Sequence, residues 1–307
     1  MRVFITGASG LLGITLADTL ASRGEMVYGI YNKNCVQIEG ASFTNLDLVN
    51  YDSLRDAMTL AEPDVVFHTA ALTNLTECES NPTLARKVNL EATRVISAIS
   101  EEIGSRLIFF STDSVFDGGR GNYREDDEPH PLNTYARMKA MAEREVARIA
   151  PKSLIIRSNF YGWGSGGKAN FGEWTIDSLR QRKSITCFKD ARNTSILVNY
   201  LADITIDLVK ASVEGIYHIG SRDPASRCDL AFGIAKAFGL DETKIALGRM
   251  EDHHFPERRP LDITLDTSKA SEELGISMPS TQDCIATFKK LEDDGFRVHV
   301  ARLRQPK

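Results

Sequence analysis

Three glycines near the start of the chain constrain its fold more than any other feature. Gly7, Gly10 and Gly13 follow the apolar run Val3–Thr6 and open a segment, 11–23, with leucines at helical spacing. Glycine permits a sharp turn and a close approach of backbone N–H groups to a ligand, and a helix N-terminus adds partial positive charge there. This strand–GxxGxxG–helix order predicts a loop that binds the pyrophosphate of a dinucleotide.

Strand-like and helix-like segments alternate through the first half of the chain, the longest helical one over about 82–103. Such alternation predicts an α/β fold with a Rossmann-type doubly wound parallel sheet, covered by helices on both faces. A glycine-rich run at 161–167 ends this regular alternation of strand-like and helix-like segments. Residues 1–160 are therefore expected to form an NAD(P)-binding Rossmann domain and 161–307 mainly a smaller C-terminal α/β substrate-binding domain. Some later segments, such as 195–212, can pack back on the first domain.

Charge and cysteine usage exclude several classes of protein. Lys and Arg total 37 and Asp and Glu total 42, so the formal charge of −5 argues against a nucleic-acid-coating surface. The five cysteines are scattered without a CxxC pair, which favours reduced thiols over a zinc site or a disulfide framework. The N-terminus lacks the shape of a signal peptide, and no apolar stretch reaches the roughly 18 residues of a membrane span. We expect a soluble cytoplasmic protein with no metal, nucleic-acid or membrane partner, and a homodimer is compatible with the sequence.

The end of the second predicted strand indicates which dinucleotide is bound. NAD-preferring sites usually place Asp or Glu there to bind the ribose hydroxyls. This chain instead has Asn32 and Lys33, so no carboxylate repels a 2′-phosphate and one ammonium attracts it. NADP(H) is therefore the expected cofactor, with NAD(H) as the alternative.

A tyrosine and a lysine four residues apart predict a catalytic pair. Tyr135 and Lys139 share one helix face with Val146, whereas Arg144 lies opposite, so Lys139 is expected to face inward. A lysine is rarely buried without a partner or a function. The functional interpretation is that Lys139 lowers the pKa of the neighbouring tyrosine and holds the ribose. A lysine that snorkels at the edge of an apolar face is the structural alternative. Upstream, an apolar strand ends in Ser111-Thr112-Asp113, where doubly wound sheets bind ligands.

These residues together resemble the extended short-chain dehydrogenase/reductase family, over nearly the whole chain. The matching motifs are TGASGLLG at 6–13, HTAA at 68–71, VN at 88–89, STDSVFDG at 111–118, YARMK at 135–139 and NFYG at 159–162. STDSVFDG and the later RPLDITLDTSK at 259–269 are most similar to the dTDP-4-dehydrorhamnose reductase branch. The resemblance implies a catalytic triad of Thr112, Tyr135 and Lys139. The cofactor-binding residues that we expect are Gly7, Ser9, Gly10, Leu11, Leu12, Gly13, Asn32, Lys33, Asp47, Leu48, Ala70, Ala71, Asn89, Ser111, Tyr135 and Lys139.

The sugar pocket departs from that branch. Ser114 stands where the branch usually has an aromatic residue, and Asn159-Phe160 replaces a serine–tryptophan pair and is closer to the NxYG of nucleotide-sugar epimerases. Asp113 is not followed by a second acidic residue, which disfavours a dehydratase. Arginines of the second half can bind a diphosphate through paired hydrogen bonds. The substrate-binding residues that we expect are Thr73, Asn74, Asp113, Ser114, Asn159, Arg192 and Arg259.

The leading hypothesis is an NAD(P)H-dependent reductase of a nucleotide-diphosphate 4-keto-6-deoxy sugar. A nucleotide-sugar 4-epimerase is the first alternative. The second is a non-catalytic NADP-binding regulatory subunit, like the beta subunit of methionine adenosyltransferase, which resembles the same branch.

Overall fold

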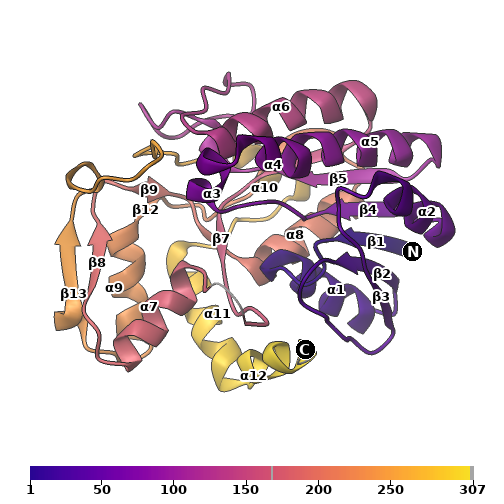
Figure 1. Ribbon diagram of the computed structural model, residues 1–307. Coiled ribbons are helices and arrows are strands. Elements are labelled where there is room, and N and C mark those ends of the chain that lie inside the picture. Colours follow the sequence, from indigo (N-terminus) through magenta and orange to yellow (C-terminus); the bar gives the residue numbers. More distant parts are fainter. Residues whose placement is uncertain (167–168, 305–307) are drawn as a thin grey trace.

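A seven-stranded parallel sheet lies at the centre of the computed structural model, which describes residues 1–166 and 169–304 (Figure 1). The strands lie side by side in the order β11-β6-β5-β4-β1-β2-β3. Their numbers fall toward β1 and then rise again, so the order in which the chain adds strands reverses at β1, as in a doubly wound fold. The predicted fold class is confirmed. The strands are β1 (Arg2–Thr6), β2 (Met26–Tyr31), β3 (Ala41–Asn45), β4 (Val65–His68), β5 (Arg106–Phe110), β6 (Leu154–Arg157) and β11 (Gly215–His218).

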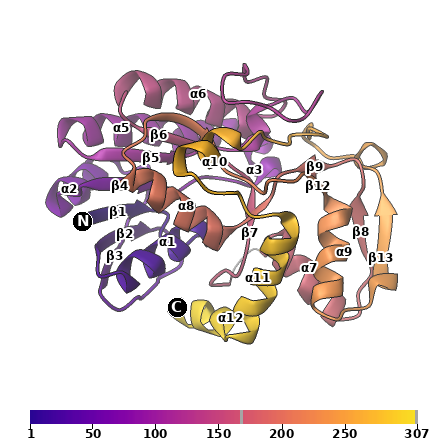
Figure 2. The ribbon, with the colours of Figure 1, turned by 180° about the vertical axis from the view of Figure 1, so that it is seen from behind.

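Helices cover both faces of this sheet because its central strands are apolar on both sides. All four residues of β4 and of β6 are buried. One core cluster joins one face to α1 (Leu11–Ser22) and α8 (Val198–Lys210). The other joins the opposite face to α2 (Tyr51–Ala61), α5 (Ala92–Glu102) and α6 (Thr134–Ile149). In Figures 1 and 2, α5 and α6 lie above the sheet and α2 lies at its outer side.

The helix predicted over about 82–103 contains a π-helical turn and is preceded by a separate short helix. The chain forms α3 (Leu75–Ser80), α4 (Pro82–Arg86), a π-helical turn (Lys87–Glu91) and then α5. The side chain of Asn81 accepts a hydrogen bond from Leu84 N at 3.0 Å and so starts α4. In the wide π turn the amide of Asn89 accepts from Leu72 N at 2.8 Å and donates to Leu72 O at 3.0 Å. The helix predicted over about 82–103 is therefore present over 82–102, and the π turn that widens it where Asn89 holds the loop after β4 was not predicted.

The rest of the chain builds a second, smaller group of elements. Here β8 pairs in parallel with β13, and α9 packs on both. Two segments return to the central layers, since α8 packs on α1 and β11 pairs with β6. The domain boundary at 160 stays a prediction. The remaining elements are the 3₁₀ turns Asp113–Val115, Glu242–Lys244 and Met250–Asp252, the strands β7 (Phe160–Tyr161), β8 (Ile185–Phe188), β9 (Arg192–Asn193), β10 (Ile196–Leu197), β12 (Ala225–Ser226) and β13 (Ile245–Gly248), and the helices α7 (Phe171–Arg180), α9 (Arg227–Ala237), α10 (Ser268–Leu274), α11 (Thr281–Asp293) and α12 (Phe296–Leu303).

The described part of the chain contains neither a membrane-spanning helix nor a cluster of metal-binding side chains. Across 1–166 and 169–304, no helix has the length and apolar character needed to cross a bilayer. Over the same ranges, no group of three His, Cys, Asp or Glu side chains is arranged to hold a metal ion.

Candidate active site

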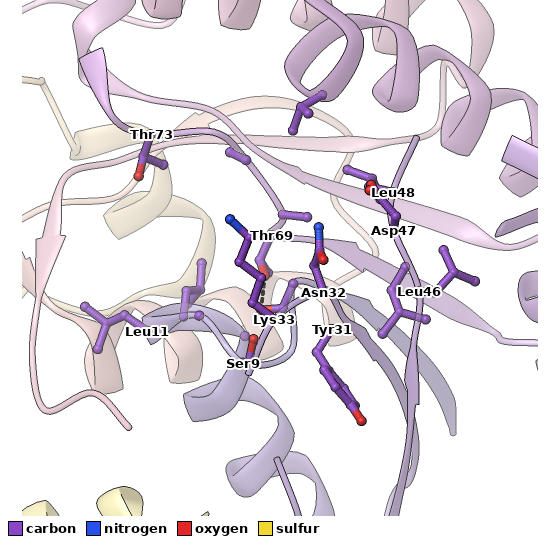
Figure 3. Close-up of a pocket in the computed structure, with 18 of the residues that line it drawn as sticks. Ser9, Leu11, Tyr31, Asn32, Lys33, Leu46, Asp47, Leu48, Thr69 and Thr73 are labelled. Carbon is purple, nitrogen blue, oxygen red and sulfur yellow. Dashed lines mark hydrogen bonds between the residues drawn. The ribbon is translucent and has the colours of Figure 1, made fainter. Parts of the chain in front are cut away.

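A cavity of about 630 Å³ opens at the carboxyl edge of the sheet, over the ends of β1, β2, β3 and β4 (Figure 3). Its volume lies in the range of small-molecule and cofactor sites. Phe160 and Asn170 of the second half close one side. Twelve of the residues predicted to bind the cofactor line it, together with Thr73, which we predicted to bind the substrate: Gly7, Ser9, Gly10, Leu11, Leu12, Gly13, Asn32, Lys33, Asp47, Leu48, Ala70 and Ala71.

The geometry of the glycine loop fits a pyrophosphate. Gly7 has φ +68°, and a Cβ there would lie 2.8 Å from the Cα of Ala70. A Cβ on Gly13 would lie 2.2 Å from the carbonyl oxygen of Gly7, so the loop can pack this closely only without side chains. Gly10 is the N-cap of α1 and has no side chain to cap the first turn. The first N–H groups of α1 therefore present donors and positive charge to the cavity.

The cavity wall near the end of β2 fits a 2′-phosphorylated cofactor. Asn32 and Lys33 are exposed and point to the same side in Figure 3, whereas Tyr31 points the other way. The cavity's one aspartate, Asp47, follows β3 instead, where it accepts a hydrogen bond from Val49 N at 3.1 Å. The residues after β2 therefore offer an amide and an ammonium, which suit a phosphate better than a ribose diol.

The α6 helix carries the predicted Tyr–Lys pair. Asn133 caps it by accepting from Ala136 N at 2.9 Å, and Tyr135 follows in the first turn, half-buried. Lys139 is 3% exposed and its Nζ donates to the carbonyl oxygen of Phe110 at 2.6 Å. Burial lowers the pKa of Lys139 to about 7, and the carboxylate of Glu143 opposes that shift. The lysine faces inward, at the end of β5, as the helical spacing predicts.

Thr112 and Asp113 face this helix from the end of β5. Thr112 Oγ1 donates to Asp113 Oδ1 at 3.1 Å and accepts from Ser114 N at 3.1 Å. Asp113 is only 1% exposed, and within the described part of the chain its Oδ2 has no hydrogen-bond partner. Burial raises the pKa of Asp113 to about 6, against the opposing charge of Arg227.

Burial also raises the pKa of Tyr135, and the nearby charge of Asp113 raises it further, while a hydrogen bond with Thr112 opposes both. The expectation that Lys139 lowers the pKa of Tyr135 is therefore not met in this structure, because burial and the charge of Asp113 dominate, and the phenol holds its proton. The site joins a proton donor, a hydroxyl and a buried carboxyl oxygen that a ligand could satisfy.

Sequence reasoning missed Arg227. It is the first residue of α9 and lies within the capping box that Ser226 and Asp229 form. Its guanidinium lies over the ring of Phe171, 4.9 Å from the centroid, and its charge acts on Asp113. Nothing in the sequence pairs this position with Asp113, since the two lie in different halves of the chain.

Arg259 lies in a neighbouring cavity of about 450 Å³. Its Nε donates to Glu257 Oε1 at 2.9 Å, and its guanidinium lies 3.9 Å from the ring centroid of Phe255. Glu257 is buried and also accepts from Thr76 Oγ1 at 3.1 Å. The carbonyl of Arg258 accepts from Asn133, the cap of α6. This segment therefore packs beside the start of the Tyr–Lys helix.

The structure separates Arg192 from this group. Its exposed side chain lines another cavity, of about 290 Å³, together with Arg120 and Arg222, and lies 3.5 Å from Asp262. Asn159, by contrast, lies beside the site, where its side chain acts to lower the pKa of Asp113 and its Oδ1 accepts from Ser195 Oγ at 2.7 Å. Both residues' roles in substrate binding stay predictions.

Four other predicted residues make structural contacts. Asn74 caps α3 by accepting from Glu77 N, and Ser114 Oγ donates to Asp113 Oδ1 at 3.2 Å. Asn89 holds Leu72, as described above. Ser111 donates to Glu143.

A buried ion pair supports the Tyr–Lys helix from behind. Glu143 is 4% exposed and Arg157, on β6, is 2% exposed, with Nη2 2.7 Å from Glu143 Oε2. Because Glu143 also accepts from Ser111, the pair ties α6 to the ends of β5 and β6. Motif analysis did not reveal this pair, because the two residues lie on different elements.

Comparison with known proteins agrees with this geometry. A family model described as the RmlD substrate binding domain matches residues 1–292. A probable low-salt glycan biosynthesis reductase of Haloferax volcanii, Agl14, is 31% identical over 96% of this chain and 99% of its own. Methionine adenosyltransferase 2 subunit beta of Danio rerio is 28% identical over 91% of this chain and 87% of its own.

Solved structures agree as well. A hypothetical dTDP-4-dehydrorhamnose reductase from Sulfolobus tokodaii has a TM-score of 0.80 and 33% identity, over 91% of this chain and 97% of that one. The dTDP-4-dehydrorhamnose reductase of Bacillus anthracis, solved in complex with NADP, has a TM-score of 0.83 and 24% identity, over 94% of this chain and 98% of that one. Since the family model spans nearly the whole chain, this protein belongs to the RmlD substrate-binding domain family.

Proposed function

We propose that the protein is an NAD(P)H-dependent reductase of a nucleotide-diphosphate 4-keto-6-deoxy sugar, with NADP(H) as the preferred cofactor. One observation carries the proposal. Tyr135 and Thr112 lie close to the buried carboxyl of Asp113, Lys139 is buried one helical turn after Tyr135 and bonded to the end of β5, and the glycine loop of the main cavity fits a dinucleotide. The reductases among the relatives described above support the same reaction class.

A reduced nicotinamide cofactor, when bound, supplies a hydride for a carbonyl carbon. Tyr135 then gives its phenolic proton to the carbonyl oxygen as negative charge develops there. Thr112 Oγ1, whose hydroxyl can rotate away from Asp113, donates a hydrogen bond to that same oxygen. Lys139, held by the carbonyl of Phe110, places a positive charge near the phenol and stabilises the phenolate left behind.

Asp113 orients the sugar in this proposal. Its Oδ1 already accepts from Thr112 and Ser114, so the free Oδ2 is available to accept from a sugar hydroxyl next to the carbonyl. Such a bond would satisfy a buried acceptor that is costly to leave unpaired. Arg259, which already lies against Phe255, is the proposed ligand of the diphosphate.

A turnover assay tests the proposal. The protein is incubated with NADPH or NADH and a panel of nucleotide-linked 4-keto-6-deoxy sugars, and cofactor oxidation is followed together with the sugar product. We expect turnover that needs both partners and is more efficient with NADPH. If neither cofactor is consumed with any keto sugar, the reductase proposal is wrong.

The relative from Danio rerio supports a second candidate, a regulatory subunit that binds a dinucleotide without turning it over. The presence of Thr112, Tyr135 and Lys139 in one site favours the enzyme. A protein that binds NADPH, turns over no keto sugar and changes the kinetics of a methionine adenosyltransferase would establish the regulatory role. A 4-epimerase would instead retain its cofactor and consume none of it.

A further inference from the structure

The last described helix, α12, lies outside the stretch that matches the family and packs against the loop after β2. The family match ends at residue 292, whereas α12 spans Phe296–Leu303. Figures 1 and 2 both show α12 below α11, with its C-terminal end on the side of the molecule that holds β2 and β3. Gln37 N donates to the carbonyl oxygen of Leu303 at 2.8 Å, and Val36 forms an antiparallel bridge with Arg304.

A side-chain contact joins the same two segments. Nη2 of the half-buried Arg304 donates to Asn34 Oδ1 at 2.6 Å. Asn34 comes directly after Asn32 and Lys33, which line the cofactor cavity. It also lines an adjoining cavity of about 380 Å³ together with Ser9 of the glycine loop. Arg304 therefore holds the residue that lies between the two cavities.

Buried apolar side chains also hold α12 and the segment after β2 in place. Val300 on α12 is 1% exposed and belongs to the same core cluster as Val36 and Ile38, which are 3% and 6% exposed. His299 Nε2 lies 3.1 Å from the carboxylate of Asp18 on α1. The backbone from Val36 onward is thus anchored by the core, whereas Asn32 and Lys33 are exposed. The bond from Arg304 extends this anchoring to Asn34, while Asn45 at the end of β3 donates to the carbonyl oxygen of Asn32.

We propose that Arg304 is a positioning residue for cofactor choice, which holds the 32–34 loop so that Asn32 and Lys33 meet the adenosine 2′-phosphate of NADP(H). The proposal rests on the proposed use of NADP(H). A loop that is ordered before binding loses less conformational entropy when it meets its ligand. The contribution is specific to the phosphorylated cofactor, because NAD(H) presents no phosphate to these two side chains.

The test compares Arg304→Ala with Arg302→Ala, a control that removes the same charge from an exposed site in the last turn of α12. Dissociation constants for NADPH and NADH are measured by calorimetry, and thermal unfolding is recorded for each variant. We expect Arg304→Ala to weaken NADPH by about tenfold, the scale of one hydrogen bond to a charged group. NADH binding should stay within about twofold. Arg302→Ala should leave both constants unchanged.

A double variant tests whether Arg304 acts on the cofactor site through Asn34. If it does, Asn34→Ala/Arg304→Ala weakens NADPH binding no more than Arg304→Ala alone. If the double variant instead loses the sum of the two single-variant losses in NADPH affinity, Arg304 does not act through Asn34. An unchanged ratio of the two dissociation constants would overturn the proposal, and so would an equal loss of both affinities with a lower melting temperature. Wild-type protein that binds neither cofactor would refute the proposed function instead.

Discussion

Lys139 on α6 and Phe110 on β5 are joined by a hydrogen bond of 2.6 Å from the buried ammonium to the main-chain carbonyl oxygen. The same ammonium lies 4.0 Å from the ring centroid of Phe109. These contacts fix the lysine at the end of the strand that continues into Thr112. The position of Lys139 relative to Thr112 is therefore set by the fold itself.

Replacing Tyr135 with phenylalanine should abolish turnover without disturbing the fold. The substitution keeps the ring and removes the proton donor, so kcat should fall by about 10²–10⁴-fold. NADPH affinity and melting temperature should stay close to wild type. Tyr200→Phe, which removes a hydroxyl bonded to Thr287 between α8 and α11, is the matched control. Near wild-type turnover in Tyr135→Phe would contradict the proton-donor role.

Replacing Asp113 with asparagine should stabilise the protein at neutral pH while lowering activity. Burial raises the pKa of this carboxyl from 3.8 to about 6, so its stabilising contribution is complete below pH 4 and is lost as the pH rises through about 6. The amide side chain introduced by Asp113→Asn would keep the Oδ1 acceptor and carry no charge. The free energy of unfolding should therefore rise by on the order of 2 kcal/mol at pH 8 and little at pH 4.

Asp117→Asn is the control with the opposite sign. A hydrogen bond from Tyr123 holds the pKa of Asp117 below its usual value, so its contribution is present at neutral pH and lost in acid. This variant should be less stable than wild type at pH 8, and the difference should shrink toward acid. Melting temperatures across the pH range distinguish the two, and a parallel response in both variants would contradict the assigned environments.

Loss of one partner of the Glu143–Arg157 ion pair should lower the free energy of unfolding much more than loss of both partners together. Arg157→Met leaves a buried carboxylate without its partner, which typically costs about 3–5 kcal/mol. The double variant Glu143→Gln/Arg157→Met removes both charges and should recover most of that loss. Urea unfolding of wild type, both single variants and the double variant measures the coupling. If the losses of unfolding free energy in the two single variants add up in the double variant, the ion pair contributes no coupling energy.

The sequence predicted those parts of the site that depend on the spacing of residues within one stretch of the chain. Glycine spacing after a strand located the loop at Gly7, and helical spacing placed Lys139 on the inward face. Arg227 and Glu257 were missed because they reach the site only through tertiary packing. The π turn at Lys87–Glu91 was missed because helical periodicity does not distinguish it from an α-helix.

Arg259→Ala should weaken the nucleotide sugar and leave NADPH binding unchanged. A uniform binding contact raises KM with little change in kcat, and the loss of a guanidinium from a phosphate should raise KM by about tenfold. Arg249→Ala, which breaks an exposed ion pair with Glu251, is the control. If Arg259 only braces Glu257, the variant will lower the melting temperature and leave KM unchanged.

Transfer of an isotopic label tests the central claim most directly. NADPH carrying deuterium at the transferable position of the nicotinamide is incubated with the protein and a nucleotide-linked 4-keto-6-deoxy sugar, and the product is analysed by mass spectrometry and NMR. A reductase places one deuterium on C4 of the sugar for each NADPH oxidised, and Tyr135→Phe suppresses this transfer. A sugar that gains no deuterium while NADPH remains bound and unoxidised would contradict the account.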